Sequence, residues 1–235
     1  MLDLGCGPGT WLRRTVDWAG KMGFTRITAR GVDLAEAQVR RARLLSQDVA
    51  RHAGVSLRFE VGDIRERMPE PDSSVDICLC LYGVLNHLPA DDFSTVFGEV
   101  ARIAKGRFVA TFRAIGSTPT IYVGVKAAKA YHQDNANGRL RVEFQNGAQT
   151  SFPSHLFSAA DIRALATPAL EIEDLSGLDL FHGRFATDPD WNPVEATPDA
   201  NFIHALRTLE RRFRRNPTFV DHATHLLLIA RPKRS

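Results

Sequence analysis

The sequence is poor in cysteine and lacks long apolar runs. Its 235 residues contain three cysteines, Cys6, Cys78 and Cys80, which argues against a disulfide scaffold and for a reducing compartment. No run of about 18 apolar residues and no basic-then-apolar leader is present, so neither membrane spanning nor export is expected. We therefore expect a cytoplasmic protein with no membrane partner.

Excess charge of one sign is also scarce. The 30 Lys and Arg residues against 27 Asp and Glu give a net charge of +3 with histidine neutral. Arginines cluster at 40–43 and 211–215, but acids are spread between them and no aromatic residues interleave, so we interpret both clusters as solvated helix faces. A nucleic-acid partner is not expected. His222 and His225 are expected on opposite faces of a strand entry, so no metal site is expected.

The first half of the chain alternates strand and helix signals. Apolar runs predict strands at 2–4, 26–33, 55–61, 75–81 and 107–112, and helical periodicity predicts helices at 10–22, 35–53 and 91–105. A chain of 235 residues suits one substantial α/β domain. Alternation of this kind predicts a doubly wound parallel sheet with helices on both faces.

The second half is less regular. We predict a helix over 120–132 and a hairpin from strands 139–144 and 148–152, which flank Gln145-Asn146-Gly147. Ser158 and Asp161 form a capping-box pattern at the start of a helix. A strand at 170–175, a helix at 200–215 and a strand at 224–230 follow. No linker separates two cores, so 1–235 is interpreted as one domain, with an insertion at 114–157 and a C-terminal half at 158–235.

Glycines are dense in the first ten residues, Met-Leu-Asp-Leu-Gly-Cys-Gly-Pro-Gly-Thr. Gly5, Gly7 and Gly9 allow positive φ angles and let a ligand approach the main chain without meeting a Cβ. The spacing differs from a dinucleotide fingerprint, because position 10 is threonine. Asp3 lies at the end of the predicted strand, where its carboxylate can receive an ammonium group.

Two further acids end predicted strands. Asp33 follows the last loop glycine by about 24 residues, and at the tip of the neighbouring strand it can accept hydrogen bonds from both hydroxyls of a ribose. Asp63 ends the third strand within Gly62-Asp63-Ile64. Because ligands of open α/β sheets lie outside the carboxyl ends of the strands, these acids and the glycine loop are expected to share one edge of the sheet.

These segments, together with 75–88 (Val-Asp-Ile-Cys-Leu-Cys-Leu-Tyr-Gly-Val-Leu-Asn-His-Leu), resemble class I methyltransferases that use S-adenosylmethionine. The resemblance covers 1–113, which it implies to be the donor-binding half. It implies S-adenosylmethionine as methyl donor, S-adenosylhomocysteine as product, and a seven-stranded Rossmann-like sheet of order 3-2-1-4-5-7-6 with the last strand antiparallel. The insertion at 114–157 would then be a substrate cap.

The resemblance also implies roles for individual residues. The methionine half of the donor would be held by the loop and by the backbone after the fourth strand, at Asp3, Gly5, Cys6, Gly7, Gly9 and Leu81. Asp33 would bind the ribose, and Leu34 would pack on the adenine face. Asp63 would accept the adenine amino group, with Ile64 against the ring.

Methyl transfer from a sulfonium needs alignment of a nucleophile and exclusion of water more than a catalytic triad. If a phenol, carboxyl or amine accepts the methyl group, one base can remove its proton, and His87 is the first candidate and Tyr82 the second. A packed or helix-capping role for His87 is the alternative. We expect transfer to an O or N of a small-molecule acceptor; an RNA or protein methyltransferase and a non-catalytic donor-binding protein are the rival interpretations.

Related enzymes carry tens of residues before the first strand, including helices that cover the donor. This chain begins inside that strand, so we expect the covering lid to be missing through an internal start or truncation, with an open variant as the alternative. Weak donor binding is the expected consequence. The acceptor, the methylated atom and the oligomeric state stay open at this point.

Overall fold

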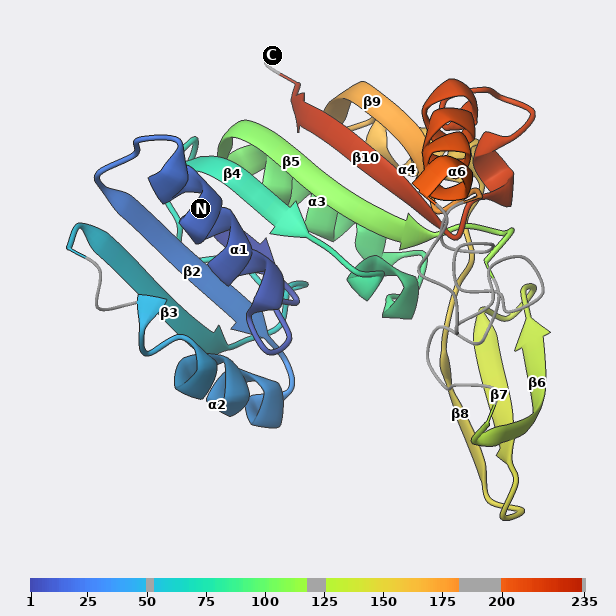
Figure 1. Ribbon diagram of the computed structural model, residues 1–235. Helices are drawn as coiled ribbons and strands as arrows, with labels where there is room; N and C mark the ends of the chain where they lie inside the picture. The colour runs from blue at the N-terminus through green and yellow to red at the C-terminus, as the bar shows by residue number, and fades with distance from the viewer. Residues whose placement is uncertain (50–52, 118–125, 182–199, 234–235) are drawn as a thin grey trace.

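The computed structural model describes residues 1–49, 53–117, 126–181 and 200–233 (Figure 1). Its main sheet has seven strands in the order β3-β2-β1-β4-β5-β10-β9. In chain order these strands are β1 (Leu2–Leu4), β2 (Ile27–Asp33), β3 (Val55–Val61), β4 (Val75–Cys80), β5 (Ala104–Arg113), β9 (Leu170–Leu178) and β10 (His225–Pro232).

Strands β1 to β5 are parallel to their neighbours, whereas β10 is antiparallel to both β5 and β9. With β9 and β10 counted as sixth and seventh strands, this confirms the expected order and the antiparallel last strand. The fold is therefore the Rossmann-like methyltransferase fold. The loops after β1, β2, β3 and β4 all leave from the carboxyl edge of the sheet, which positions the candidate site.

Helices cover both faces of this sheet, as Figure 1 shows. On one face, α1 (Thr10–Lys21) and α2 (Glu36–Leu45) bury Leu12, Val16, Val39 and Ala42 against β2 and β3. On the other face, α3 (Asp92–Ile103) and α4 (Ala159–Ala166) pack into a larger core that includes five phenylalanines. A further helix, α6 (Ala200–Phe213), follows β9 in the chain. No helix of the described ranges has the length and apolarity that crossing a bilayer requires.

The segment between β5 and α4 forms a separate three-stranded antiparallel sheet. It consists of β6 (Ala128–Asp134), β7 (Arg139–Phe144) and β8 (Gln149–Pro153), in that order, and it projects away from the main sheet beyond the carboxyl end of β5 (Figure 1). The β7–β8 hairpin turns at Gly147, whose φ of 83° confirms the predicted turn. Whether this small sheet is a substrate cap stays a prediction.

Two predicted helices differ from the structure. The helix predicted over 120–132 is wrong for residues 128–132, which lie in β6 and pair with β7; residues 118–125 lie outside the described residues. Here strand pairing overrides the high helix propensity of the Ala-Lys sequence. The helix predicted over 35–53 ends at Leu45, where the N–H of Ser46 bonds to the carbonyl of Arg43 and closes a tight last turn.

Two smaller predictions concern helix ends and the C-terminal histidines. The capping box of α4 is confirmed, because the Ser158 side chain accepts from the N–H of Asp161 and the Asp161 carboxylate accepts from that of Ser158. His222 is not on a strand entry, since it ends the short 3-10 helix η4 (Val220–His222). His225 is the first residue of β10.

Candidate functional site

The glycine loop after β1 folds tightly against the end of β2. The N–H groups of Gly5 and Cys6 both donate to the carbonyl of Val32, at 2.8 and 2.9 Å. Gly5 has a φ of 72°, and a Cβ at this position would overlap the side chain of Val84. Glycine is therefore required at position 5 both by backbone conformation and by the close approach of the segment after β4.

The carboxylate of Asp33 joins this loop to the start of the next helical segment. Its Oδ2 accepts from the N–H of Gly7 at 2.8 Å, and its Oδ1 accepts from the N–H of Ala35, also at 2.8 Å. Each carboxylate oxygen has a second lone pair. Asp33 therefore holds the loop in place and can still accept hydrogen bonds from a ligand in front of it.

Asp3 is a buried acid at the base of the loop, with 2% of its surface exposed. Burial, reinforced by the nearby charge of Asp33, raises the pKa of Asp3 to about 7. A carboxylate in this environment is stabilised by a cationic partner. Cys6 follows the first loop glycine, and burial raises the pKa of its thiol above the ordinary value. Cys6 therefore stays protonated and does not act as a nucleophile.

The backbone after β4 has an unusual conformation. Tyr82 and Gly83 both lie in the left-handed region, with φ of 69° and 77°, and a bulky residue such as tyrosine rarely adopts this conformation. The N–H of Tyr82 donates to Oγ1 of Thr111 on β5 at 2.6 Å, which holds the turn in place. Strain of this kind gathers at functional sites, and here it presents the tyrosine ring, 66% exposed, outward from the sheet edge.

The 3-10 helix η2 (Val84–His87) follows this turn in the chain, and its last residue contacts the end of β8. Asn86 is fully buried; its Oδ1 accepts from the N–H of Arg113, and its Nδ2 donates to the carbonyls of Arg113 and His155. Nδ1 of His87 lies 2.8 Å from the carbonyl oxygen of Pro153. A carbonyl only accepts, so Nδ1 carries the proton, and in the neutral ring Nε2 keeps its lone pair.

These elements surround one cavity of about 620 Å³ at the carboxyl edge of the sheet. A volume of this size suits a small-molecule ligand. The cavity brings together eight of the residues that the sequence singles out: Asp3, Gly5, Cys6, Gly7, Asp33, Leu81, Tyr82 and His87.

Four other predicted residues do not line this cavity. Gly9 is the N-cap of α1, and a Cβ there would lie 2.7 Å from the ring of Phe59. Leu34 is 68% exposed, and Ile64 is buried in the main core. Asp63 lies beyond Gly62, whose N–H bonds to the carbonyl of Asp33, and its carboxylate is paired with Arg65. The hydrogen bond from Arg65 lowers the pKa of Asp63.

The cavity also contains residues that sequence reasoning missed: Pro8, Thr10, Trp11, Gln38 and Val84. Pro8, Thr10 and Trp11 follow directly from the glycine loop, so their position in the chain was the available signal. Gln38 lies in the first turn of α2, and Val84 begins η2. Only the packing of these helices against the loop reveals the last two.

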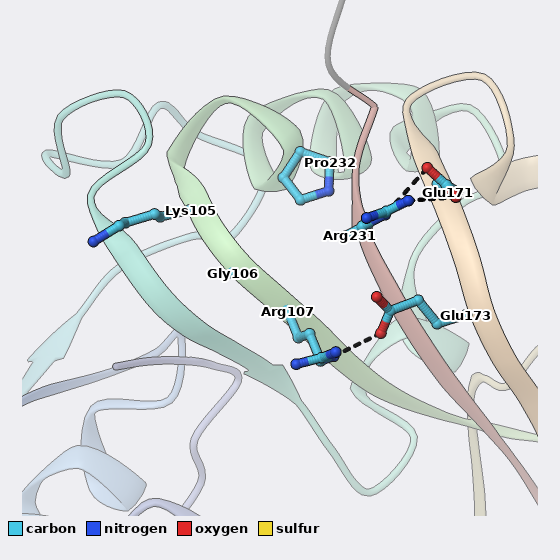
Figure 2. A pocket seen from close by; sticks show the side chains of 7 residues that line it. All are labelled: Lys105, Gly106, Arg107, Glu171, Glu173, Arg231 and Pro232. Carbon is cyan, nitrogen blue, oxygen red and sulfur yellow. Dashed lines mark hydrogen bonds and ion pairs between the residues drawn. The ribbon is translucent and has the colours of Figure 1, made fainter. Parts of the chain in front are cut away.

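A different hollow, of about 420 Å³, lies at the opposite end of the strands, where β5 and β9 begin and β10 ends. Figure 2 shows Arg107 pointing toward Glu173 and Arg231 toward Glu171, with Lys105 apart from them. Arg107 pairs with Glu173 at 2.6 Å and Arg231 with Glu171 at 2.7 Å. These are largely exposed ion pairs, which contribute little stability, and the charges satisfy one another. We therefore do not treat this hollow as a candidate site. In the described ranges, no group of three or more His, Cys, Asp or Glu side chains could hold a metal ion.

Comparison with known proteins gives three results. Residues 1–107 match the methyltransferase domain family. The probable methyltransferase ltbC of Aspergillus luteorubrus is 31% identical over 115 residues, which cover 47% of this chain and 38% of that protein. The chain thus spans well under half the length of this relative.

Solved structures with the same fold include the PH0226 protein of Pyrococcus horikoshii, at 19% identity, a TM-score of 0.61, and coverage of 99% of this chain and 81% of that one. An S-adenosylmethionine-dependent methyltransferase of Clostridium acetobutylicum is 13% identical, with a TM-score of 0.58 and coverage of 98% of this chain and 82% of that one. Magnesium protoporphyrin IX methyltransferase of Synechocystis, solved with bound S-adenosylmethionine, is 16% identical, with a TM-score of 0.50 and coverage of 99% of this chain and 69% of that one. At these identities the likeness concerns the fold.

Proposed function

We propose that this protein, whose residues 1–107 match the methyltransferase domain family, is an S-adenosylmethionine-dependent methyltransferase that acts on an O or N of a small molecule. S-adenosylmethionine supplies an activated methyl group on a sulfonium and leaves as S-adenosylhomocysteine. The observation that carries the proposal is the convergence of Asp3, the glycine loop and Asp33 on one cavity at the carboxyl edge of the sheet.

The residues around the cavity fit the donor. The buried Asp3 carboxylate gains a cationic partner when an ammonium enters. A Cβ built on Gly7 meets nothing within 4 Å, so the loop backbone is open to a ligand at this position. The free lone pairs of Asp33 accept hydroxyl hydrogen bonds from a ribose. The methionine half then lies along the loop and near the backbone of Leu81, and Gly9, the N-cap of α1, supports the loop from outside the cavity.

We assign the adenine end to the edge beyond Asp33. Leu34 is exposed there, so an adenine ring packed on it covers apolar surface. Asp63 is the proposed acceptor for the adenine amino group, and to take that role it shares its oxygens with Arg65. Ile64 supports this edge from within the core rather than from the cavity wall.

The molecule that receives the methyl group is activated by its position and by one base that takes its proton. His87 is the proposed base, because its Nδ1 proton is committed to Pro153 and Nε2 is the nitrogen that can take a proton. Tyr82 is the second candidate, since it lies on the same cavity wall. Holding the acceptor in line with the methyl group and away from water accounts for the remaining rate.

Calorimetry with S-adenosylmethionine, S-adenosylhomocysteine and NADH tests donor binding, and incubation of radiolabelled donor with a metabolite extract tests transfer. We expect binding of both adenosyl compounds, no binding of NADH, and label in the small-molecule fraction. Label in added RNA or protein would favour those acceptors instead, and donor binding without any labelled product would indicate a non-catalytic protein. Full turnover by His87→Ala at neutral pH would reject the base assignment.

A further inference from the structure

A second cavity, of about 480 Å³, adjoins the first one. The two cavities share Trp11, Leu81 and Tyr82, so the strained turn after β4 forms part of the wall between them. The rest of the second cavity comes from β5, the end of β9 and the start of β10: Val109, Thr111, Leu178, Asp179, Thr224, His225 and Leu227. A molecule in this cavity would lie directly beside the proposed donor site.

The second cavity is mainly apolar, and both of its threonine hydroxyl groups make hydrogen bonds. Oγ1 of Thr111 accepts from the N–H of Tyr82, and Oγ1 of Thr224 donates to the carbonyl of Asp179 at 3.1 Å. Trp11, Leu178 and Leu227 contribute apolar wall. An occupant therefore meets a largely hydrophobic surface with few polar groups, as is usual for small-molecule sites.

Whereas Asp179 is exposed to solvent, His225 is the buried polar side chain of this wall. It is 8% exposed, and its ring lies 5.9 Å from the ring of Tyr82, centroid to centroid. In the part of the chain that the structure describes, no hydrogen bond engages either ring nitrogen of His225. The ring nitrogens of His225 are therefore available for hydrogen bonds with a molecule in the cavity.

The surroundings of His225 favour the neutral ring. Burial lowers its pKa; the charge of Asp179, after β9, opposes this effect, and that of Arg113, on β5, adds to it. The phenol ring of Tyr82 also faces the imidazole. Neutral imidazole offers one donor and one acceptor and no charge. A charged ligand group buried against it would lose hydration, and Asp179, the acid in the same wall, is exposed to solvent and compensates a cation only weakly.

We propose that the second cavity is the acceptor subsite, and that it selects an uncharged, ring-sized, mainly apolar molecule with a polar substituent that hydrogen-bonds to His225. This inference rests on the proposed function. The apolar body of the acceptor packs between Trp11, Leu178 and Leu227, and its methyl-accepting atom faces the wall shared with the donor cavity. His225 is thus a specificity residue, distinct from the proposed base His87.

The test uses four naphthalene probes and the full chain. Binding of 1-naphthol, naphthalene, 1-naphthoate and 1-naphthylmethylammonium is measured by ligand-observed NMR with S-adenosylhomocysteine present, and the affinity for S-adenosylhomocysteine is measured separately by calorimetry. We expect 1-naphthol to bind best, about tenfold more tightly than naphthalene and than either charged probe.

Variants then separate the role of His225 from general damage. His225→Phe keeps the ring contact with Tyr82 but removes the hydrogen bond, so we expect 1-naphthol binding to fall about tenfold. His225→Gln should restore part of it. Leu227→Trp, which narrows the cavity, should weaken both 1-naphthol and naphthalene. His204→Phe, at an exposed position on α6, is the matched control and should leave the affinities for 1-naphthol and naphthalene unchanged.

The outcomes distinguish the two proposals. If S-adenosylhomocysteine does not bind the wild type, the proposed function and this inference both fail. If S-adenosylhomocysteine binds but 1-naphthol does not, the acceptor subsite is wrong and the proposed function stands. The same holds if both His225→Phe and Leu227→Trp bind 1-naphthol as tightly as the wild type does. Preference for the ammonium probe would overturn the uncharged class and indicate recognition by Asp179.

Discussion

The backbone N–H of Gly7 donates to Oδ2 of Asp33 at 2.8 Å, which joins the loop after β1 to the end of β2. The same carboxylate accepts from the N–H of Ala35 through its other oxygen. One side chain therefore fixes the glycine loop, starts the segment that leads into α2 and faces the cavity. The conformation of the loop and the lining of the cavity are therefore coupled through Asp33.

Replacing Asp33 should weaken donor binding more than the loss of one ligand contact would. Asp33→Ala removes the acceptors for the loop and for the proposed ribose hydroxyls, and we expect the affinity for S-adenosylhomocysteine to fall about ten- to hundredfold. Calorimetry measures this directly. Asp17→Ala is the control, because that acid is exposed and paired only with Lys21 on α1. Equal affinities of Asp33→Ala and wild type would remove the ribose assignment.

The raised pKa of Asp3 makes stability depend on pH in a defined direction. The folded state holds this proton up to a pKa of about 7, whereas the unfolded chain loses it near 3.8. Stability from this group is therefore fully present below about pH 4 and is lost as pH rises to about 7. Between these limits we expect Asp3→Asn to gain on the wild type, by at most about 4 kcal/mol.

Urea unfolding at several pH values compares Asp3→Asn with the wild type, and other titrating groups cancel in the difference. A difference that does not change between about pH 4 and pH 8 would contradict the raised pKa. The same acid should influence ligand binding. In the wild type the affinity for S-adenosylhomocysteine should rise as Asp3 ionises, and in Asp3→Asn this rise should be absent.

Gly5→Ala should destabilise the protein through two separable effects. The positive φ costs about 1 kcal/mol for a residue with a Cβ, and the overlap with Val84 adds about 1–3 kcal/mol of overpacking. The double variant Gly5→Ala/Val84→Ala should recover the second cost, apart from the cavity that it creates, but not the first. Gly7 has a φ of 53°, and a Cβ added there meets open space. The variant Gly7→Ala therefore measures the conformational cost alone.

Thermal or urea unfolding of these variants gives the free energies. If Gly5→Ala is no less stable than Gly7→Ala, the close approach of the loop to η2 is not a constraint on this position.

Asn86→Ala should be among the more destabilising single substitutions in the site. It leaves the N–H of Arg113 and the carbonyl of His155 without their side-chain partner, whereas the carbonyl of Arg113 keeps the N–H of Phe157, and each unsatisfied buried group costs about 1–3 kcal/mol. We expect a loss of more than about 2 kcal/mol by urea unfolding. Asn137→Ala is the control, since its bonds to Asp134 are exposed; a similar loss in both variants would contradict the assignment.

The agreement between the sequence-based predictions and the structure differs between the two halves of the chain. In the first half, strands alternate with helices and each strand pairs with a parallel neighbour, so apolar periodicity was enough to predict the sheet and to bring Asp3 and Asp33 to one edge. In the second half, residues 128–132 have the composition of a helix but pair with β7 as a strand. Pairing partners distant in the chain decide such segments, and local propensity does not contain them.

The sequence by itself determined the order of the elements, the glycine loop and the acids that follow β1 and β2, because these depend on local periodicity and on the rules of parallel sheets. Only the tertiary structure decided that Asp3 is buried enough to hold its proton to about pH 7, and that His225 faces Tyr82 across a second cavity. Burial and electrostatic environment arise from elements far apart in the chain, which become neighbours only when the sheet assembles.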